Sequence, residues 1–216
     1  MKKLIKGILI ICTLIAIVSL MYIILLYPKH EYSESRVNDT SITLNDLIFK
    51  TIPKGFSGSD KKLETEITIT EEDLENLVLN AYNDKNKLEK VDVIIEDSII
   101  KVYAVKKYMD IFPVEISGDI EVKHDDYKMK LYLKDIKAGK IQLSSSSILE
   151  NIKEQNIPFL DIKPTSREVV IHDETLDGVI EVSGVTADSK VIKIGLDFRF
   201  TKIESFINIV NKLKKN

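Results

Sequence analysis

The sequence has almost no cysteine: Cys12 is the one such residue among 216. Cys12 lies inside a long apolar run near the N-terminus, and Ile11 stands where a lipoprotein signal needs a small side chain. We therefore interpret Cys12 as an ordinary apolar residue of that run. The rest of the chain has no cysteine, so a domain folded there must be held together by packing, without disulfides.

Sequence motifs of catalysis are missing as well. The chain has no phosphate-binding loop, no dinucleotide-binding glycine pattern, no Cys-x-x-Cys pair and no Gly-x-Ser-x-Gly elbow. We interpret the serine run Ser144–Ser147 as the cap of a following helix. The acids Glu71, Glu72 and Asp73 suit the first turn of another helix, where the helix dipole favours negative charge. We therefore predict no catalytic residues and no cofactor.

Histidine is scarce, with three residues in the chain. His30 follows the apolar run in a polar segment, where we expect it to be solvated. His124 and His172 are each followed by acids at the expected ends of strands, and together they would offer nitrogen and oxygen ligands to a divalent metal. Polar residues also collect at turns for purely structural reasons, so we predict no metal site.

Arginine is the rarer basic residue, with 3 arginines against 28 lysines. This usage, with abundant isoleucine, is typical of a bacterium with an AT-rich genome. The whole chain carries a formal charge of −3 and its first 27 residues carry +3, so the remainder carries −6. An acidic domain lacks the basic face that phosphates require, which argues against a nucleic-acid partner.

An uncharged run of 21 residues extends from Gly7 to Tyr27, after Lys2, Lys3 and Lys6. At about 1.5 Å per residue, a helix of this length spans about 31 Å and matches a hydrocarbon core about 30 Å thick. The run is longer than the apolar part of a signal peptide and ends without a small-residue cleavage site. We predict an uncleaved transmembrane anchor over residues 1–27, with the N-terminus cytoplasmic and the rest outside the cell membrane.

The segment after the anchor, residues 28–61, is polar and has no long apolar period, which predicts a stalk. One helical turn is expected near Leu44, and Pro53 and Gly55 break the chain. Residues 62–216 are predicted to form one extracytoplasmic domain. Alternation of apolar and polar residues predicts eight strands in it. They are 63–69, 90–96, 99–107, 114–122, 127–133, 167–173, 178–185 and 190–200.

Three helices are expected in this domain. The first covers 71–83 and is capped by Thr70, the second follows Ser144–Ser147, and the third covers 202–214. The third has an apolar stripe that we expect to pack on the domain. Its alternatives are to close a groove or to lie on the membrane. Since the strands follow one another as hairpins, the fold class is α+β: a curved or twisted antiparallel sheet of about eight strands with two or three packed helices.

The order of these features resembles the YpmS-like family, small membrane-anchored extracytoplasmic proteins of low-GC Gram-positive bacteria. The matching segments are ITEEDLENLVLNAYND, PVEISGDIEV and KLYLKDIKAGKIQLSSSSILENI. The resemblance covers roughly residues 63–200, whereas the closing helix and Ser144–Ser147 depart from the family pattern. It implies the fold and the location, and it implies no particular activity.

A curved sheet wrapped around helices can hold a lipid tail, as in tubular lipid-binding proteins. The alternative, equally open, is that the helices simply cover the sheet and leave no groove. The candidate apolar lining consists of Leu77, Ala81, Tyr82, Ile116, Ile120, Leu149 and Ile152.

We predict a non-enzymatic binding protein whose ligand is a lipid or another apolar molecule of the cell envelope. The alternative is an interaction or scaffold subunit of an envelope protein complex that binds no small molecule. An open apolar groove would favour the first, and a filled core with an exposed apolar patch would favour the second.

Overall fold

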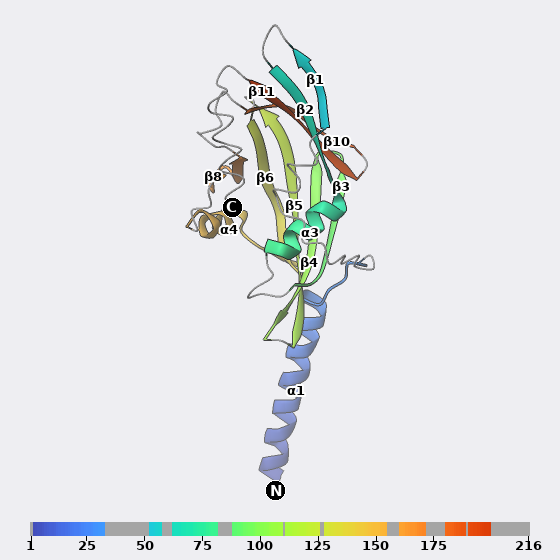
Figure 1. The fold of residues 1–216 in the computed structure, drawn as a ribbon. Helices are drawn as coiled ribbons and strands as arrows, with labels where there is room; N and C mark the ends of the chain where they lie inside the picture. The colour runs from blue at the N-terminus through green and yellow to red at the C-terminus, as the bar shows by residue number, and fades with distance from the viewer. Residues whose placement is uncertain are drawn as a thin grey trace.

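The computed structural model describes residues 2–32, 52–57, 62–81, 88–109, 111–125, 128–154, 160–171, 180–188 and 190–199. Within these ranges the chain forms three helices and two antiparallel sheets (Figure 1). The predicted α+β class is therefore confirmed. The predicted helix over 202–214 lies outside the described residues.

The larger sheet has seven strands in the order β3-β4-β5-β6-β9-β8, with the short β7 paired to β6. All of its neighbouring strands are antiparallel. The strands are β3 (Leu88–Glu96), β4 (Ile99–Tyr108), β5 (Phe112–Asp125), β6 (Lys128–Ala138), β7 (Ile141–Gln142), β8 (Leu160–Lys163) and β9 (Glu168–Ile171).

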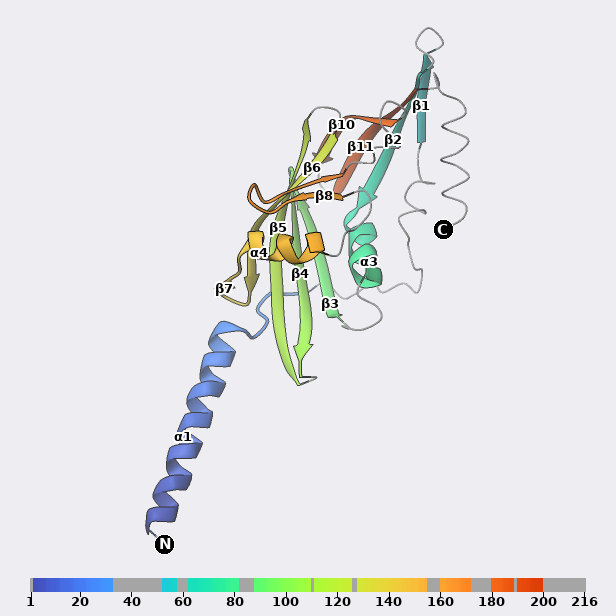
Figure 2. The same ribbon diagram turned by 90° about the vertical axis from the view of Figure 1, so that its left-hand side faces the viewer.

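The smaller sheet has four antiparallel strands in the order β1-β2-β11-β10. It lies at the end of the molecule away from the N-terminal helix (Figure 2). Its strands are β1 (Ile52–Ser57), β2 (Lys62–Thr70), β10 (Ile180–Asp188) and β11 (Val191–Arg199).

All eight predicted strands are present, but they divide between two sheets instead of forming one. Strands β1, β7 and β8 were not predicted, and β1 lies inside the segment predicted to be a stalk. The pairing of β1 with β2 is irregular between Pro53 and Gly55. Because proline and glycine normally interrupt strands, these two residues kept β1 from being predicted from the sequence.

The main core lies between the two sheets. Alternate residues of β3, β4 and β5 face the four-stranded sheet, which contributes Ile192 and Ile194 of β11. Buried area of this kind is the main stabilising contribution in a domain without disulfides. The eight buried residues are Val91, Val93, Ile95, Ile100, Ala104, Val122, Ile192 and Ile194.

Helix α3 (Glu71–Ala81) begins directly after β2 and packs beside β3. Its first turn is a reciprocal cap, as predicted: Asp73 N donates to Thr70 Oγ1 at 3.1 Å, and Thr70 N donates to Asp73 Oδ2 at 3.0 Å. Glu71 and Glu75, one turn apart, accept hydrogen bonds from the backbone N–H groups of Ile95 (2.9 Å) and Val93 (3.2 Å). The helix therefore covers the free edge of β3, a terminal strand of its sheet.

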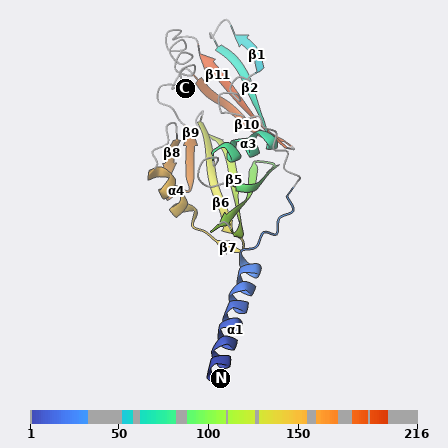
Figure 3. The same ribbon diagram turned by 60° about the horizontal axis from the view of Figure 1, so that its bottom comes forward.

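Helix α4 (Ser145–Glu154) forms a second, smaller core at the other edge of the seven-stranded sheet, beside β8 and β9 (Figure 3). Its centre is Leu149, which is completely buried against Ile162 and Val169. Ser147 N donates to Ser144 Oγ at 3.3 Å, which confirms the predicted serine cap.

The N-terminal helix α1 (Lys2–Leu25) projects from the end of the molecule opposite the four-stranded sheet (Figure 1). Residues 10–21 are all exposed, with no face turned towards the domain. In the part of the chain that the structure describes, no helix is both long enough and apolar enough to cross a membrane. The structure thus has a helix where an anchor was predicted, and the membrane-spanning role is taken up below as a proposal.

Candidate functional site

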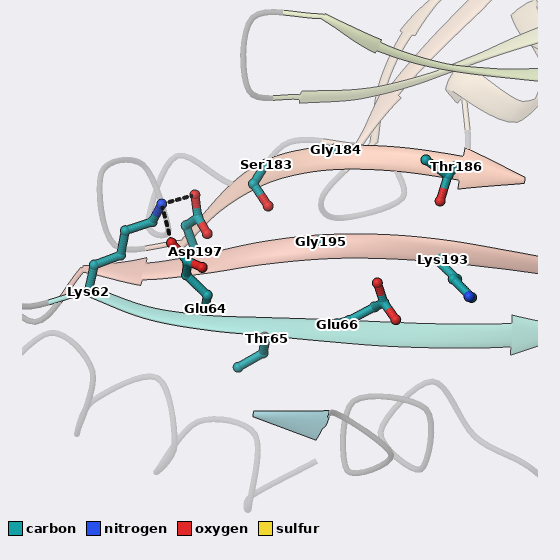
Figure 4. Close-up of a pocket in the computed structure, with 10 residues that line it drawn as sticks. All are labelled: Lys62, Glu64, Thr65, Glu66, Ser183, Gly184, Thr186, Lys193, Gly195 and Asp197. Atoms are coloured by element: carbon teal, nitrogen blue, oxygen red, sulfur yellow. Dashed lines mark hydrogen bonds and ion pairs between the residues drawn. The ribbon is translucent and has the colours of Figure 1, made fainter. Parts of the chain in front are cut away.

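A polar hollow of about 290 Å³ lies on the outer face of the four-stranded sheet (Figure 4). It exists because Gly184 of β10 and Gly195 of β11 pair directly opposite each other, so neither places a side chain on this face. A register irregularity between Val182 and Gly184 accompanies the gap. The lining residues are Lys62, Glu64, Thr65, Glu66, Ser183, Gly184, Thr186, Lys193, Gly195 and Asp197.

The charges at one end of this hollow are paired. Lys62 Nζ lies 2.7 Å from Asp197 Oδ2 and 3.2 Å from Glu64 Oε1. The hydrogen bond to Asp197, followed by that to Glu64, raises the pKa of Lys62 above its ordinary value. Since the lining carries carboxylates, ammonium groups and hydroxyls, the hollow suits a polar partner and not an acyl chain.

A second polar cluster lies where the chain leaves α1 and crosses the outward face of the seven-stranded sheet. The His30 ring stacks on Tyr103 with a centroid separation of 3.8 Å and an interplanar angle of 0°. Its Nε2 donates to Asp92 Oδ2 at 2.5 Å, and the two side chains are only 18% and 11% exposed. The prediction that His30 is solvated is therefore wrong, because the segment after α1 folds back onto the sheet.

Glu115 of β5 holds the backbone of the same segment. Its Oε2 accepts hydrogen bonds from the N–H groups of Lys29 at 3.0 Å and His30 at 2.9 Å, and from Tyr32 Oη at 3.3 Å. Burial, and then the negative charge of Glu115, raises the pKa of Tyr32 well above its ordinary value. We call residues 29–32 with Asp92, Tyr103 and Glu115 the anchor clamp.

The end of α1 is fixed to the domain at two further points. Lys140 N donates to Leu25 O at 2.7 Å, and Glu115 N donates to Leu26 O at 3.5 Å. Gly139 has φ +57°, and a Cβ added there would overlap the Leu25 carbonyl group. A glycine at this turn therefore lets the chain approach the end of the helix closely.

Of the seven residues predicted to line an apolar groove, the five whose side chains the structure describes do not form one group. Leu149 and Ile152 belong to the small core beneath α4, whereas Ile120 packs against the main core. Ile116 is 37% exposed on β5. Leu77 is partly buried on α3, Ala81 is the last residue of that helix, and Tyr82 lies outside the described residues.

The two described histidines have separate structural partners, because His30 bonds Asp92 and His124 bonds the Val182 carbonyl. His124 Nε2 lies 2.7 Å from the carbonyl oxygen of Val182, and His172 lies outside the described residues. Across the described ranges, no group of three or more His, Cys, Asp or Glu side chains is arranged to hold a metal ion.

Comparison with protein-family models, with curated proteins and with solved structures found no match to this chain. Sequence reasoning missed both the hollow and the anchor clamp. Two glycines inside predicted strands were a usable signal for the hollow, because glycine within a strand often marks a bulge or a gap. The clamp had no comparable signal, since its members are spread over 86 positions from Lys29 to Glu115.

Proposed function

We propose that the chain is a non-enzymatic binding protein tethered to the outer face of the cell membrane by α1. The observation that carries the proposal is the exposed apolar surface of α1, whose large aliphatic and methionine side chains from Ile10 to Ile24 are 46% to 64% exposed. Water is a poor environment for such a surface, whereas acyl chains match it. The sequence supplies the uncharged length that a bilayer span needs, because the uncharged run extends over 21 residues from Gly7 to Tyr27.

The direction of the tether follows from charge. Lys2, Lys3 and Lys6 precede the uncharged run, and the positive-inside rule keeps such a terminus in the cytoplasm. Protease added to intact cells without a wall should then remove the domain and spare the N-terminus. Cleavage of the domain only after lysis would reverse the assigned orientation, and release of an intact full-length chain by salt would contradict the anchor itself.

For the binding partner, the geometry best supports an interaction subunit of an envelope assembly. The four-stranded sheet lies at the end of the domain away from α1, and its outer face presents the polar hollow with Lys193 and Thr186 at the rim (Figure 4). A partner that also stands clear of the membrane can reach this face. Membership of the YpmS-like family is part of the same proposal and rests on the sequence pattern.

A photo-crosslinking residue tests the face directly. Placed at Thr186, which lines the hollow, it should give a discrete cross-linked species in intact cells. The matched control is Ser166, an exposed residue of the β8–β9 turn outside the hollow. Equal cross-linking from both positions, or none from either, would contradict a specific partner at this face.

An apolar ligand remains the second candidate. The supporting observation is that Leu131 packs against both apolar cores, so the two are close neighbours along β6. A lipid tail would have to enter beside it. Native mass spectrometry of the full chain released from detergent should show a bound lipid mass if this candidate is right, and a bare chain if it is wrong.

A further inference from the structure

The hairpin of β4 and β5 ends in an apolar tip made of Tyr108, Met109, Ile111 and Phe112. These side chains are 62%, 69%, 69% and 43% exposed. Ile111 N donates to Tyr108 O at 3.3 Å, so the turn that carries them is closed. A tip of two aromatic and two aliphatic side chains in water is unusual for a surface turn and marks a contact site.

Exposed apolar residues of the domain gather at this end. Beyond α1 and Tyr27, the described residues include seven exposed large apolar side chains, and four of them form the tip. Two more lie beside the end of α1: Ile141 follows Lys140, and Ile116 pairs with Ala138 just before Gly139. The seventh, Ile171, pairs with Met129 at the opposite end of β6. The distribution is therefore polarised towards the helix.

The tip is continuous with α1 itself. The rings of Phe112 and Tyr22 meet edge to face with centroids 5.4 Å apart, and Tyr22 Oη donates to Pro113 O at 2.7 Å. Figures 1 and 2 both show the β4–β5 hairpin projecting from the domain on the side of α1. The apolar surface of the helix and that of the tip thus share one boundary, at the level of Tyr22.

Positive charge borders the same boundary. Lys29 and Lys140 are both exposed beside the end of α1. The pKa of Lys29 lies below its ordinary value. The larger cause is a hydrogen bond between its amine and that of Lys140, and the second is the repulsion between the two like charges. An anionic phosphate group placed between them would relieve this repulsion.

We infer that the tip residues Tyr108, Met109, Ile111 and Phe112 enter the bilayer interface next to the outer end of α1. The occupant of this surface is lipid: aromatic rings favour the headgroup level, aliphatic side chains favour the acyl boundary, and two lysines face the phosphates. This inference rests on the proposed function, since it requires α1 to lie in the membrane. It adds a second contact, which sets the tilt of the domain relative to the bilayer.

The chain has no tryptophan, so a single introduced tryptophan reports one position without background. The full chain carrying Ile111→Trp is reconstituted into vesicles of phosphatidylcholine with a minor fraction of phosphatidylglycerol. Part of the phosphatidylcholine carries bromine on its acyl chains, which quenches nearby tryptophan. The tryptophan of Ile111→Trp in vesicles should emit at a shorter wavelength than the same tryptophan in the unfolded chain. Brominated lipid should quench most of its fluorescence.

Two other single-tryptophan variants make the result decisive. Val18→Trp lies on α1 and reports the anchor, whereas Ile171→Trp is an exposed apolar position far from it. Quenching at 18 and 111 but not at 171 supports the inference. Quenching at 18 alone overturns it and leaves the anchor standing, and no quenching at any position overturns the anchor as well.

Two remaining outcomes are also informative. Quenching at all three positions would mean that the whole domain lies on the bilayer, which contradicts a contact confined to the tip. The more conservative Tyr108→Trp repeats the measurement on the other strand of the hairpin. It should be quenched like Ile111→Trp, and a difference between the two would overturn a common insertion of the tip.

Discussion

The two faces of the seven-stranded sheet differ in what covers them. One face packs against the four-stranded sheet through apolar side chains such as Val93, which is 2% exposed. Asp92, the residue before Val93 on the same strand, lies on the other face and bonds His30 within the anchor clamp. Apolar packing is strong but non-directional, whereas hydrogen bonds have fixed geometry. The first face therefore accounts for most of the stability, and the second specifies where the segment after α1 docks.

The largest expected effect comes from breaking the apolar face. Ile192 of β11 is 3% exposed in the main core, and Ile192→Ala should reduce the free energy of unfolding by about 2–5 kcal/mol through lost burial and a residual cavity. Chemical denaturation of the full chain in detergent measures this. Lys193→Ala, next along the strand on the polar outer face, is the matched control, and equal losses for both variants would contradict the assigned faces.

Breaking the polar face should have an intermediate effect. His30→Ala removes the ring stacked on Tyr103 and a hydrogen-bond partner of the buried Asp92, and should reduce stability by about 1–3 kcal/mol. The loss should shrink when Asp92→Asn is already present, because the two side chains act as a pair. A double-mutant cycle of unfolding free energies measures the coupling, and additive losses would argue against the clamp.

Removing the charge of Glu75 is expected to have a smaller effect on stability, and one of opposite sign. Burial, and then the nearby charge of Asp92, raises the pKa of this carboxyl group, against the lowering effect of its hydrogen bond from Val93 N. A raised pKa means that the folded state binds the proton more tightly than the unfolded state. This contribution therefore stabilises the fold as pH falls from neutral towards the ordinary pKa of glutamate.

Glu75→Gln keeps an acceptor oxygen for Val93 N and removes the charge, so it should stabilise the protein slightly at neutral pH. The difference from the parent should shrink as the pH is lowered, because the folded parent then takes up a proton at Glu75. Melting temperatures of both proteins across this pH range test the sign. A variant that is less stable than the parent at neutral pH would show that the carboxylate charge is needed.

The smallest effect is expected at the other described histidine. His124 is exposed and makes one hydrogen bond to the Val182 carbonyl, so His124→Ala should change stability by no more than about 0.5 kcal/mol. The contrast with His30→Ala sharpens the comparison, because the residue type is the same and only the surroundings differ. Thermal melts with and without a chelator should be superimposable for both variants.

The sequence predicted strands well because each strand shows its own alternation, and every one of the eight is present. It could not predict how strands divide between sheets, because Ile67 and Val93 have the same local pattern although they belong to different sheets. The five described residues of the predicted apolar lining do not form one group for a related reason. Each is apolar on one face of its own element, and that pattern does not distinguish a filled core from an open groove.

The anchor clamp lay beyond sequence reasoning for another reason. Its contacts join the segment after α1 to strands far along the chain, and a polar segment such as PKHEY looks like a solvated linker in isolation. Only the three-dimensional approach of Glu115 and Asp92 explains why these residues are ordered against the sheet. The polar hollow depends similarly on two glycines becoming neighbours through strand pairing.

The two glutamates that α3 directs at β3 affect how copies of the protein can pair with one another. A terminal strand with free N–H groups can recruit a strand from another molecule, and this leads to edge-to-edge aggregation. By accepting the N–H groups of Val93 and Ile95, Glu75 and Glu71 occupy two of the donors that a neighbouring copy would need along that edge. Under the proposed membrane tether, copies on one surface would meet far more often than free ones, and the position of α3 against β3 would then oppose strand-to-strand pairing between them.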